Sequence, residues 1–186
     1  MKIRLATPEI QRDSIVDGEG IRSVIWTQGC KHHCPGCHNP ITHSFNGGFT
    51  VDTEEIKEKI KKIEGQDGVT FSGGDPMEQP EPCAELAKYC KSLGLNIWCY
   101  TGYTFEELLE KASNDSFILD FLKNIDILVD GKFVLKEKSY DATFRGSKNQ
   151  RIIDVPRSLA ARKAIIVTKY ENTFEENEHK KKNIYI

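Results

Sequence analysis

The sequence predicts an α/β domain built on a parallel sheet with crossover helices. Apolar segments of strand length alternate along the chain with segments whose apolar residues recur at helical spacing. Each polar motif that could carry chemistry directly follows one of the predicted strands, as in folds whose sites lie at the carboxyl ends of parallel strands. A chain of 186 residues, 38% of them hydrophobic, is long enough for one substantial core. We therefore expect one domain over residues 1–168 and a charged tail over residues 169–186.

The first part of the chain is expected to form a weak strand or arm at residues 3–7 and a firm strand at residues 22–28. A turn signal, Asp-Gly-Glu-Gly at residues 17–20, leads into the firm strand. Residues 43–50 are polar and contain two glycines, which favours a loop.

Asp52 is a suitable N-cap for the next helix, and Glu55 would complete a capping box. The apolar stripe of this helix consists of Ile56, Ile60 and Ile63. A strand beginning at Val69 is expected after it.

The clearest helical pattern covers residues 80–93, and Gly94 stands where a left-handed C-terminal cap belongs. One face of this helix contains Cys83, Leu86, Ala87, Cys90 and Leu93. These two cysteines are therefore interpreted as small buried apolar residues rather than as ligands.

The second part of the chain continues the alternation until residue 130 and then loses it. The remaining expected elements are a strand at 96–101 with Cys99 in the core, a helix capped by Thr104 and Glu107, a helical stretch at 117–123, and strands at 125–130, 151–155 and 164–168, with a helical turn started by Pro156. Residues 132–149 are rich in charge and show no sustained period, which is typical of a loop.

A cysteine motif follows the strand at residues 22–28. Cys30, Cys34 and Cys37 are spaced C-x3-C-x2-C, with Gly29 and Pro35-Gly36 favouring an irregular loop. Disulfide pairing would leave one of the three unpaired, whereas three thiolates on one loop suit a metal or an iron–sulfur cluster. A [4Fe–4S] cluster held by three thiolates keeps one iron open to a non-protein ligand.

A structural zinc site is the alternative interpretation of the same residues. His32, His33 or His38 could complete a tetrahedral Cys3His set, which would make the chain a non-catalytic interaction module.

Composition limits the other function classes. The net charge of −2 gives no reason to expect nucleic-acid or membrane binding, and no apolar stretch is long enough to span a bilayer. Six cysteines and no recognisable export signal in the N-terminal residues favour a cytoplasmic location.

A second polar motif, Ser72-Gly73-Gly74-Asp75-Pro76, follows the strand that begins at Val69. Its glycines would let the backbone approach a ligand, and its carboxylate could accept from an ammonium group. An ordinary strand-to-helix turn has the same composition. Two further polar clusters, Tyr100-Thr101-Gly102-Tyr103 and Asp130-Gly131-Lys132, also end strands.

The cysteine motif and its flanks resemble the radical S-adenosylmethionine enzymes, and among them the activating enzymes of glycyl-radical enzymes. The residues that carry this resemblance are Asp17-Gly18-Glu19-Gly20-Ile21-Arg22, Gln28-Gly29-Cys30 and Cys34-Pro35-Gly36-Cys37-His38-Asn39-Pro40. Gly36 stands where many radical enzymes have an aromatic residue, as is usual in activators of anaerobic ribonucleoside-triphosphate reductase. The resemblance covers roughly residues 15–155 and leaves the charged C-terminal end unexplained.

The resemblance implies a partial, open TIM-like barrel of about five to six βα units. It implies that the open iron binds the methionine moiety of S-adenosylmethionine, and that the residues around it contribute to the cofactor site. The implied cofactor-binding residues are Gly36, His38, Ser72, Gly73, Gly74, Asp75, Thr101, Asp130 and Lys132. Asp75 replaces the glutamate of the family's Gly-Gly-Glu element and reaches one methylene less far. Lys132 could equally be a solvated surface lysine, and His38 could merely pack on the loop.

The implied activity is reductive cleavage of S-adenosylmethionine, followed by hydrogen abstraction from a glycine of the large subunit of anaerobic ribonucleotide reductase. A flavodoxin or ferredoxin would supply the electron. Residues 140–154 are expected either to contact the partner or to form a plain surface loop. Activation of another glycyl-radical enzyme, such as pyruvate formate-lyase, is an alternative, and 7-carboxy-7-deazaguanine synthase is a more distant one.

Overall fold

A mixed β-sheet with helices packed on one face forms the protein, for which the computed structural model describes residues 1–171. Within these residues the sheet has eight strands in the order β4-β1-β3-β5-β6-β7-β8, with β2 paired to β3. The strands are β1 (Lys2–Leu5), β2 (Gln11–Ser14), β3 (Arg22–Thr27), β4 (Phe49–Asp52), β5 (Gly68–Gly73), β6 (Asn96–Tyr100), β7 (Ile127–Asp130) and β8 (Arg151–Asp154). The helices are α1 (Thr53–Lys61), α2 (Pro80–Ser92), α3 (Phe105–Lys111), α4 (Ser116–Leu122) and α5 (Val155–Ala161).

The α/β class is confirmed, and the parallel arrangement holds for the centre of the sheet. Strands β3, β5, β6 and β7 are parallel neighbours, each joined to the next by a connection that contains a helix. The expectation of an entirely parallel sheet was wrong at the edges. Strand β8 runs antiparallel to β7 because the loop between them contains no crossover α-helix and turns the chain straight back.

The N-terminal edge of the sheet is also antiparallel. Strand β1 pairs with both β3 and β4, and β2 pairs with β3. Strands β2 and β4 are absent from the sequence-based assignment, and the expected loop at residues 43–50 ends earlier, because Phe49 already belongs to β4. Each of these two strands has four residues with a single buried side chain, Ser14 in β2 and Val51 in β4. Such short segments give almost no alternation to read.

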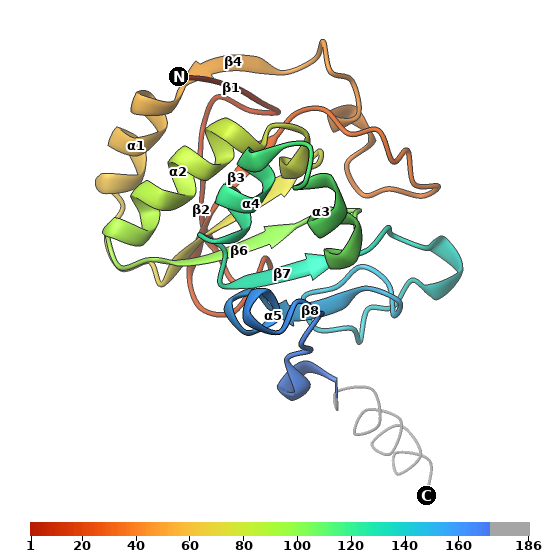
Figure 1. The fold of residues 1–186 in the computed structure, drawn as a ribbon. Helices are drawn as coiled ribbons and strands as arrows, with labels where there is room; N and C mark the ends of the chain where they lie inside the picture. The colour runs from red at the N-terminus through yellow and green to blue at the C-terminus, as the bar shows by residue number, and fades with distance from the viewer. Residues whose placement is uncertain (172–186) are drawn as a thin grey trace, which may run out of the picture.

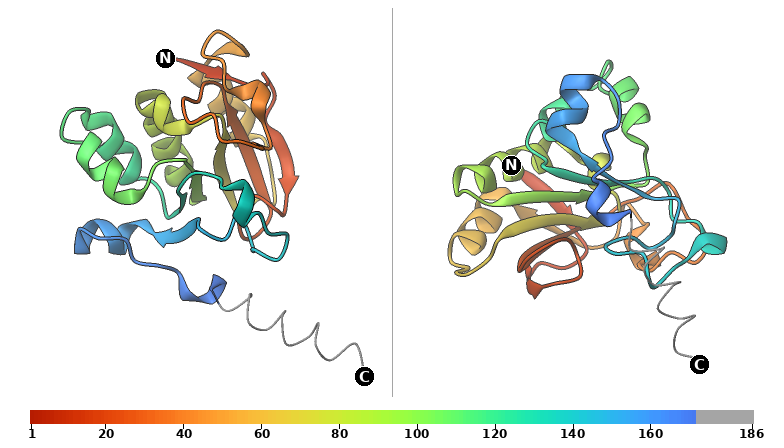
Figure 2. Two further views of the ribbon diagram at one scale, coloured as in Figure 1. Left: turned by 90° about the vertical axis from the view of Figure 1, so that its right-hand side faces the viewer. Right: turned by 90° about the horizontal axis from the view of Figure 1, so that it is seen from below.

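Helices α1 to α4 cover one face of the sheet, as Figures 1 and 2 show, and enclose the main hydrophobic core. In α1, Ile56 and Ile60 are buried, as predicted, and Ile63 packs against the core just beyond the helix. Asp52 is the N-cap, but its side chain accepts from the backbone N–H of Glu54. The expected capping box with Glu55 therefore does not form.

Helix α2 places Cys83 and Cys90 in the core, which confirms their interpretation as buried apolar residues. The prediction for Leu93 was wrong: its side chain is 42% exposed. The helix ends at Ser92, and Leu93 is already the cap that turns towards solvent before Gly94, which has the expected positive φ of 79°.

The last described residues close the sheet differently from the prediction. The expected strand at 164–168 is reduced to one bridge between Ile153 and Ile166, after which a short 3-10 turn begins at Thr168. The expected tail at 169–186 lies outside the described residues beyond position 171. Its first residues pack on the domain, since Tyr170 is buried against Trp98.

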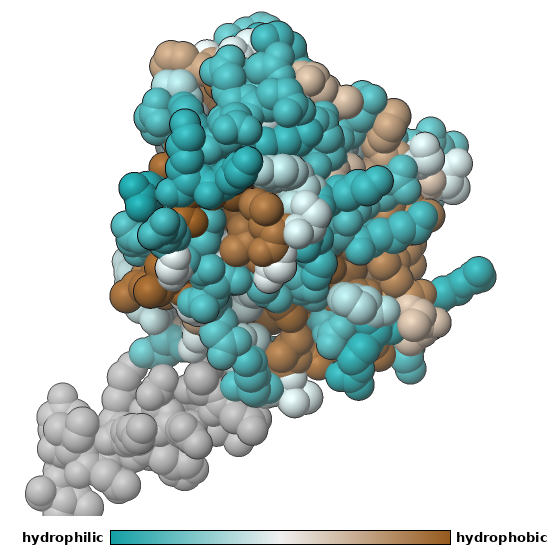
Figure 3. Space-filling model, turned by 90° about the vertical axis from the view of Figure 1, so that its left-hand side faces the viewer, coloured by the Kyte–Doolittle hydropathy of each residue, from teal (hydrophilic) through white to brown (hydrophobic). Residues whose placement is uncertain are grey.

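The face shown in Figure 3 is largely hydrophilic, with hydrophobic residues confined to separate patches. No helix among residues 1–171 is long and apolar enough to cross a membrane.

Candidate functional site

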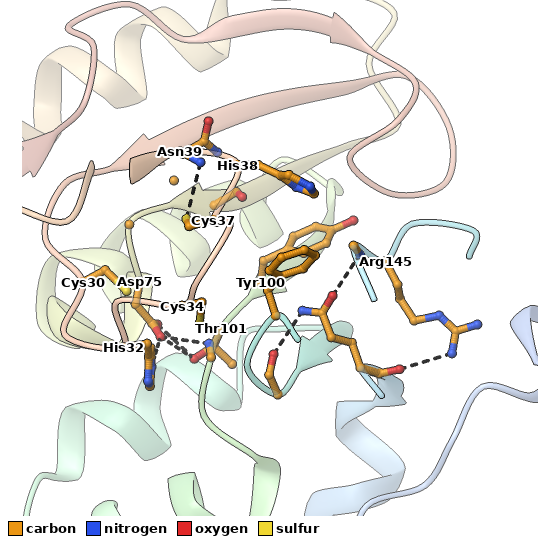
Figure 4. A pocket seen from close by; sticks show the side chains of 18 of the residues that line it. Cys30, His32, Cys34, Cys37, His38, Asn39, Asp75, Tyr100, Thr101 and Arg145 are labelled. Carbon is orange, nitrogen blue, oxygen red and sulfur yellow. Dashed lines mark hydrogen bonds and ion pairs between the residues drawn. The ribbon is translucent and has the colours of Figure 1, made fainter. Parts of the chain in front are cut away.

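A pocket of about 530 Å³ lies at the carboxyl ends of β3, β5 and β6, where the sequence places its polar motifs. Figure 4 shows residues of these motifs around the pocket. The predicted site residues that line it are Cys30, Cys34, Cys37, His38, Ser72, Gly73, Gly74, Asp75 and Thr101. Motifs that are far apart in the sequence therefore meet in one cavity, as the strand-end argument predicts.

The cysteine loop, residues 28–39, leaves β3 and is fastened by hydrogen bonds to the segment that follows it. The backbone N–H groups of Gly29 and Cys30 donate to the carbonyls of Thr42 and His43 at 2.8 and 3.1 Å. The Gln28 side chain donates to the carbonyl of Ser44 at 2.7 Å. The loop is thus held by the backbone, which leaves the sulfur atoms of its cysteines available for other ligands.

The three motif cysteines are free thiols, and burial disfavours the charged form of Cys30 and Cys34. Burial raises the pKa of the Cys30 thiol to about 11. Burial also raises the pKa of Cys34, although the backbone N–H of Phe133 donates to its sulfur and opposes the rise. Thiolates become stable here only beside a strong positive charge, which bound iron supplies. The donor set therefore fits an iron–sulfur cluster held by three cysteines.

The glycines of the second motif let its turn pack directly on the cysteine loop. A Cβ at Gly74 would lie 2.4 Å from the carbonyl oxygen of Gly29, and one at Gly73 would lie 2.5 Å from that of Thr27. The backbone N–H of Gly74 donates to Thr27 at 2.7 Å, and that of Asp75 donates to Gly29 at 2.9 Å. The close approach that these glycines permit is thus to the chain itself, where the turn supports the start of the cysteine loop.

Asp75 is the centre of the hydrogen-bond network in the pocket, and it is 1% exposed. Its carboxylate accepts from the Thr101 hydroxyl at 2.9 Å and from the backbone N–H groups of Met77 and Gly102 at 3.0 Å each. The Nε2 atom of His32 lies 2.8 Å from it and donates the fourth hydrogen bond. These donors use essentially all the acceptor capacity of the carboxylate. One side chain thus joins the cysteine loop, its own turn and the end of β6.

Gly36 and Lys132 lie outside the pocket, whereas His38 lines it. Gly36 does not line it, and the Leu135 side chain occupies the space where a Cβ would be, at 2.8 Å. The His38 ring packs against Phe133, with ring centroids 5.0 Å apart. Lys132 is exposed on the loop that follows β7 and does not line the pocket.

Asp130 is buried below the pocket rather than facing it. Its carboxylate accepts from Arg151 Nε at 2.9 Å and from the backbone N–H of Phe105 at 2.7 Å. Arg151 also pairs with Glu106 at 2.6 Å. In this arrangement Asp130 fastens the end of β7 to the start of α3 and to β8.

Two pocket residues are more important than the sequence-based reasoning suggested. His32 was considered only as a zinc ligand, yet it is the residue of the cysteine loop that reaches Asp75. Arg145 lies in the aperiodic stretch after β7, where no periodic pattern marks it, and it lines the pocket although it is only 7% exposed. In the sequence-based reasoning Arg145 was included only as part of residues 140–154, which were expected to contact the partner or to form a plain surface loop.

The zinc alternative requires a histidine beside the three thiols, and the candidate histidines have other contacts. His32 is bonded to Asp75, the ring of His33 packs against His43 with centroids 5.0 Å apart, and His38 packs against Phe133. Residues 1–171 contain no group of three or more His, Cys, Asp or Glu side chains arranged to hold a single metal ion.

Comparison with known proteins agrees with the cluster interpretation. The model of the 4Fe-4S single cluster domain family matches residues 16–153. Curated relatives include the anaerobic ribonucleoside-triphosphate reductase-activating protein of Pasteurella multocida, which is 37% identical over 148 residues covering 74% of this chain and 90% of that protein. The activating proteins of Escherichia coli K12 and of phage T4 are 34% and 35% identical over 73% and 74% of this chain, and over 90% and 86% of their own lengths.

The family model matches most of the chain, and each of these relatives is aligned over nearly its whole length. The match begins just before the first strand of the pocket and ends in β8, so it contains every residue of the site described above. The chain therefore belongs to the 4Fe-4S single cluster domain family and to the anaerobic ribonucleoside-triphosphate reductase-activating proteins.

Proposed function

We propose that this protein is a radical S-adenosylmethionine enzyme that generates a glycyl radical on the large subunit of anaerobic ribonucleoside-triphosphate reductase. The observation that carries the proposal is the convergence of three free cysteines with the Ser72–Asp75 turn and Thr101 in one pocket. The named relatives, which are activating proteins of this reductase, support the choice of substrate.

We further propose that the sheet is the open, partial βα barrel of the radical S-adenosylmethionine enzymes. The four parallel strands β3, β5, β6 and β7, with helices on one face only, are consistent with part of such a barrel. The antiparallel β8 then closes one edge without a further βα unit.

In this proposal Cys30, Cys34 and Cys37 hold a [4Fe–4S] cluster, and S-adenosylmethionine occupies the rest of the pocket. When bound and reduced, such a cluster would supply the electron for reductive cleavage of S-adenosylmethionine, which would allow hydrogen abstraction from the substrate glycine. The chain itself contributes placement and exclusion of water. No acid, base or nucleophile is required of it.

Ser72, Gly73, Gly74, Asp75 and Thr101 are proposed to form the methionine end of the cofactor site. Asp75 can receive the amino group of the cofactor only if one of its present donors moves. His32 and Thr101 are the donors that can do so, because they donate from side chains that can rotate, whereas Met77 and Gly102 donate from the backbone. The protein thus keeps the carboxylate satisfied before the ligand arrives.

Lys132, Gly36 and His38 are proposed to act at the edge of the cofactor site. The ammonium group of Lys132 lies close enough to Cys34 to favour its thiolate, so it can attract the methionine carboxylate at the mouth. Gly36 and His38 shape the cysteine loop beside the cluster. Asp130 is proposed to act indirectly, by fixing the strand end from which Lys132 extends.

The electron donor is proposed to be a flavodoxin or ferredoxin, and the compartment to be the cytoplasm, where the six free thiols would stay reduced. The pocket opens to the surface, and its lining includes exposed residues such as Tyr140. An open mouth of this kind suits a substrate glycine delivered on a protein segment better than a small molecule.

Anaerobic reconstitution with iron and sulfide tests the proposal. The protein should turn brown, bind about four irons per chain as one [4Fe–4S] cluster requires, and form 5′-deoxyadenosine from S-adenosylmethionine with dithionite. Addition of the reductase should give the electron paramagnetic resonance signal of a glycyl radical, whereas pyruvate formate-lyase should give none. A colourless protein that binds one zinc ion and forms no 5′-deoxyadenosine would refute the proposal.

A further inference from the structure

The loop between β7 and β8, residues 131–150, forms one wall of the pocket and carries exposed apolar side chains at its mouth. Figure 1 shows this loop and the cysteine loop projecting on the same side of the molecule. Tyr140 is 92% exposed and Leu135 is 52% exposed. Val16, which follows β2, also lines the pocket and is 70% exposed. Apolar side chains gathered at the rim of a site are typical of interaction surfaces.

This loop is internally ordered, so these side chains are presented in fixed positions. The backbone N–H of Lys148 donates to Glu137 at 2.9 Å, and that of Val134 donates to the Ser147 hydroxyl at 3.1 Å. Ser147 is fully buried and also forms a bridge with Lys138. The exposed residues are therefore carried by a hydrogen-bonded hairpin, which loses little entropy when a partner binds.

The charge of the hairpin differs from that of the rest of the chain. Residues 132–148 contain five basic and two acidic residues, whereas the whole chain has a net charge of −2. Lys132, Lys136 and Lys138 are exposed, and neither Lys136 nor Lys138 forms an ion pair within residues 1–171. The Lys138 ammonium instead lies 4.9 Å from the centre of the Tyr140 ring. The positive charges of Lys136 and Lys138 therefore favour a negatively charged partner.

We propose that Val16, Leu135, Lys136, Lys138 and Tyr140 form a docking surface for an acidic segment of the reductase that flanks its substrate glycine. This inference rests on the proposed function, because a glycine must be brought into the pocket from outside. Tyr140 and Leu135 supply apolar contact area, and the two lysines pair with carboxylates of the incoming segment. The surface is continuous with the pocket, since Lys138 and Tyr140 also line it.

The hairpin also touches the residues that support the cysteines. Leu135 packs over Gly36, and Phe133 contacts both the His38 ring and the sulfur of Cys34. A partner bound on the hairpin is therefore one layer of side chains away from the cysteine loop. This proximity fits a surface whose occupant must lie within reach of the reaction.

Charge reversal in the reconstituted enzyme tests the docking surface. The double variant Lys136→Glu/Lys138→Glu should bind the reductase about tenfold more weakly, with a smaller dependence on salt than the unchanged enzyme. The matched control Lys61→Glu/Lys88→Glu makes the same change in charge on exposed positions of α1 and α2 and should bind normally. The control and the single variant Lys136→Glu, whose side chain does not line the pocket, should form 5′-deoxyadenosine at the normal rate in the absence of reductase, and the single variant should still bind the reductase more weakly than the unchanged enzyme.

A second pair of variants tests the apolar part. Tyr140→Ala should also weaken binding about tenfold, whereas Phe117→Ala, which removes a partly exposed aromatic ring from α4, should not. The docking surface is overturned if Lys136→Glu/Lys138→Glu and Tyr140→Ala bind the reductase as tightly as the unchanged enzyme. It is also overturned if the control Lys61→Glu/Lys88→Glu weakens reductase binding as much as the charge reversal on the hairpin does. If the anionic partner is instead a nucleotide, Lys136→Glu/Lys138→Glu would abolish binding of added nucleoside triphosphate and leave reductase binding unchanged. That result also overturns the docking surface. If the unchanged enzyme forms no 5′-deoxyadenosine without reductase, the result instead counts against the proposed function.

Discussion

Replacement of Asp75 by asparagine is the most informative single change, because the aspartate connects three parts of the pocket. Its carboxylate accepts from Thr101, Met77, Gly102 and His32 at 2.8 to 3.0 Å while almost fully buried. Asparagine offers one acceptor oxygen in place of two and points an NH₂ group at donors. At least one buried backbone N–H would therefore lose its acceptor.

The size of the effect follows from those lost bonds. Each buried donor left without a partner costs about 1–3 kcal/mol, and hydrogen bonds to a charged group are worth about 1.5–3 kcal/mol. We expect Asp75→Asn to lower the free energy of unfolding by about 2–5 kcal/mol, a large share of the stability of a domain of this size. Urea denaturation of the cluster-free protein, followed by circular dichroism, measures this directly.

A matched control separates this effect from a general change of charge. Asp115 caps α4 through the backbone N–H of Phe117, and asparagine is an equally good cap there, so Asp115→Asn should change the free energy of unfolding by less than about 0.5 kcal/mol. If Asp75→Asn also changes it by less than about 0.5 kcal/mol, the carboxylate does not organise the pocket, and the reasoning given for His32 fails with it.

Three further predictions follow from the site and the fold. Cys34→Ala should abolish both the brown colour and 5′-deoxyadenosine formation. Its control, Cys83→Ala, on the buried face of α2, should keep both and lower the free energy of unfolding by about 1 kcal/mol. Full activity of the Cys34 variant would contradict the cluster assignment. Gly74→Ala should reduce the iron content after reconstitution and lower stability by about 1–3 kcal/mol, because its Cβ meets backbone. In the control, Gly65→Ala, the added Cβ has no neighbouring atom within 4 Å and the only cost is the strain of a positive φ, so the iron content should be normal. Equal iron content in the Gly74 and Gly65 variants would argue against the packing of the turn on the cysteine loop. The backbone N–H of Glu54 and the ammonium group of Lys2 lower the pKa of Asp52 from 3.8 to about 2, so its stabilising effect is complete above about pH 4 and is lost as the pH falls towards 2. Asp52→Asn should therefore lose less stability than the unchanged protein over that range in urea titrations, and parallel curves would refute the assignment.

The centre of the fold could be predicted from the sequence because its signals are local. The stripe of Ile56 and Ile60, the cap at Thr104 and the left-handed Gly94 each depend on residues within one or two helical turns. The pairing of β1 with β4 depends instead on contacts between residues about fifty positions apart. No short window contains that information, so the antiparallel edge of the sheet was missed.

The site was predictable to a similar extent. The rule that parallel strands end at one edge brought the cysteines together with Asp75 and Thr101. The same rule placed Asp130 at that edge, but it could not reveal that Arg151, from the neighbouring strand, would occupy its carboxylate. It also gave no information on Arg145, whose place in the pocket depends on the path of a loop without periodicity.

The contact between His32 and Asp75 has a consequence for the order in which the site is assembled during synthesis. The two residues are 43 positions apart, and Thr101 and Gly102, which also bind the carboxylate, lie 26 and 27 positions further on. The cysteines therefore leave the ribosome well before Thr101 and Gly102, which complete the hydrogen bonds to Asp75. A nascent chain that ends before β6 contains the three thiols and the segments that fasten their loop, but only a chain that has passed β6 contains every donor to the Asp75 carboxylate.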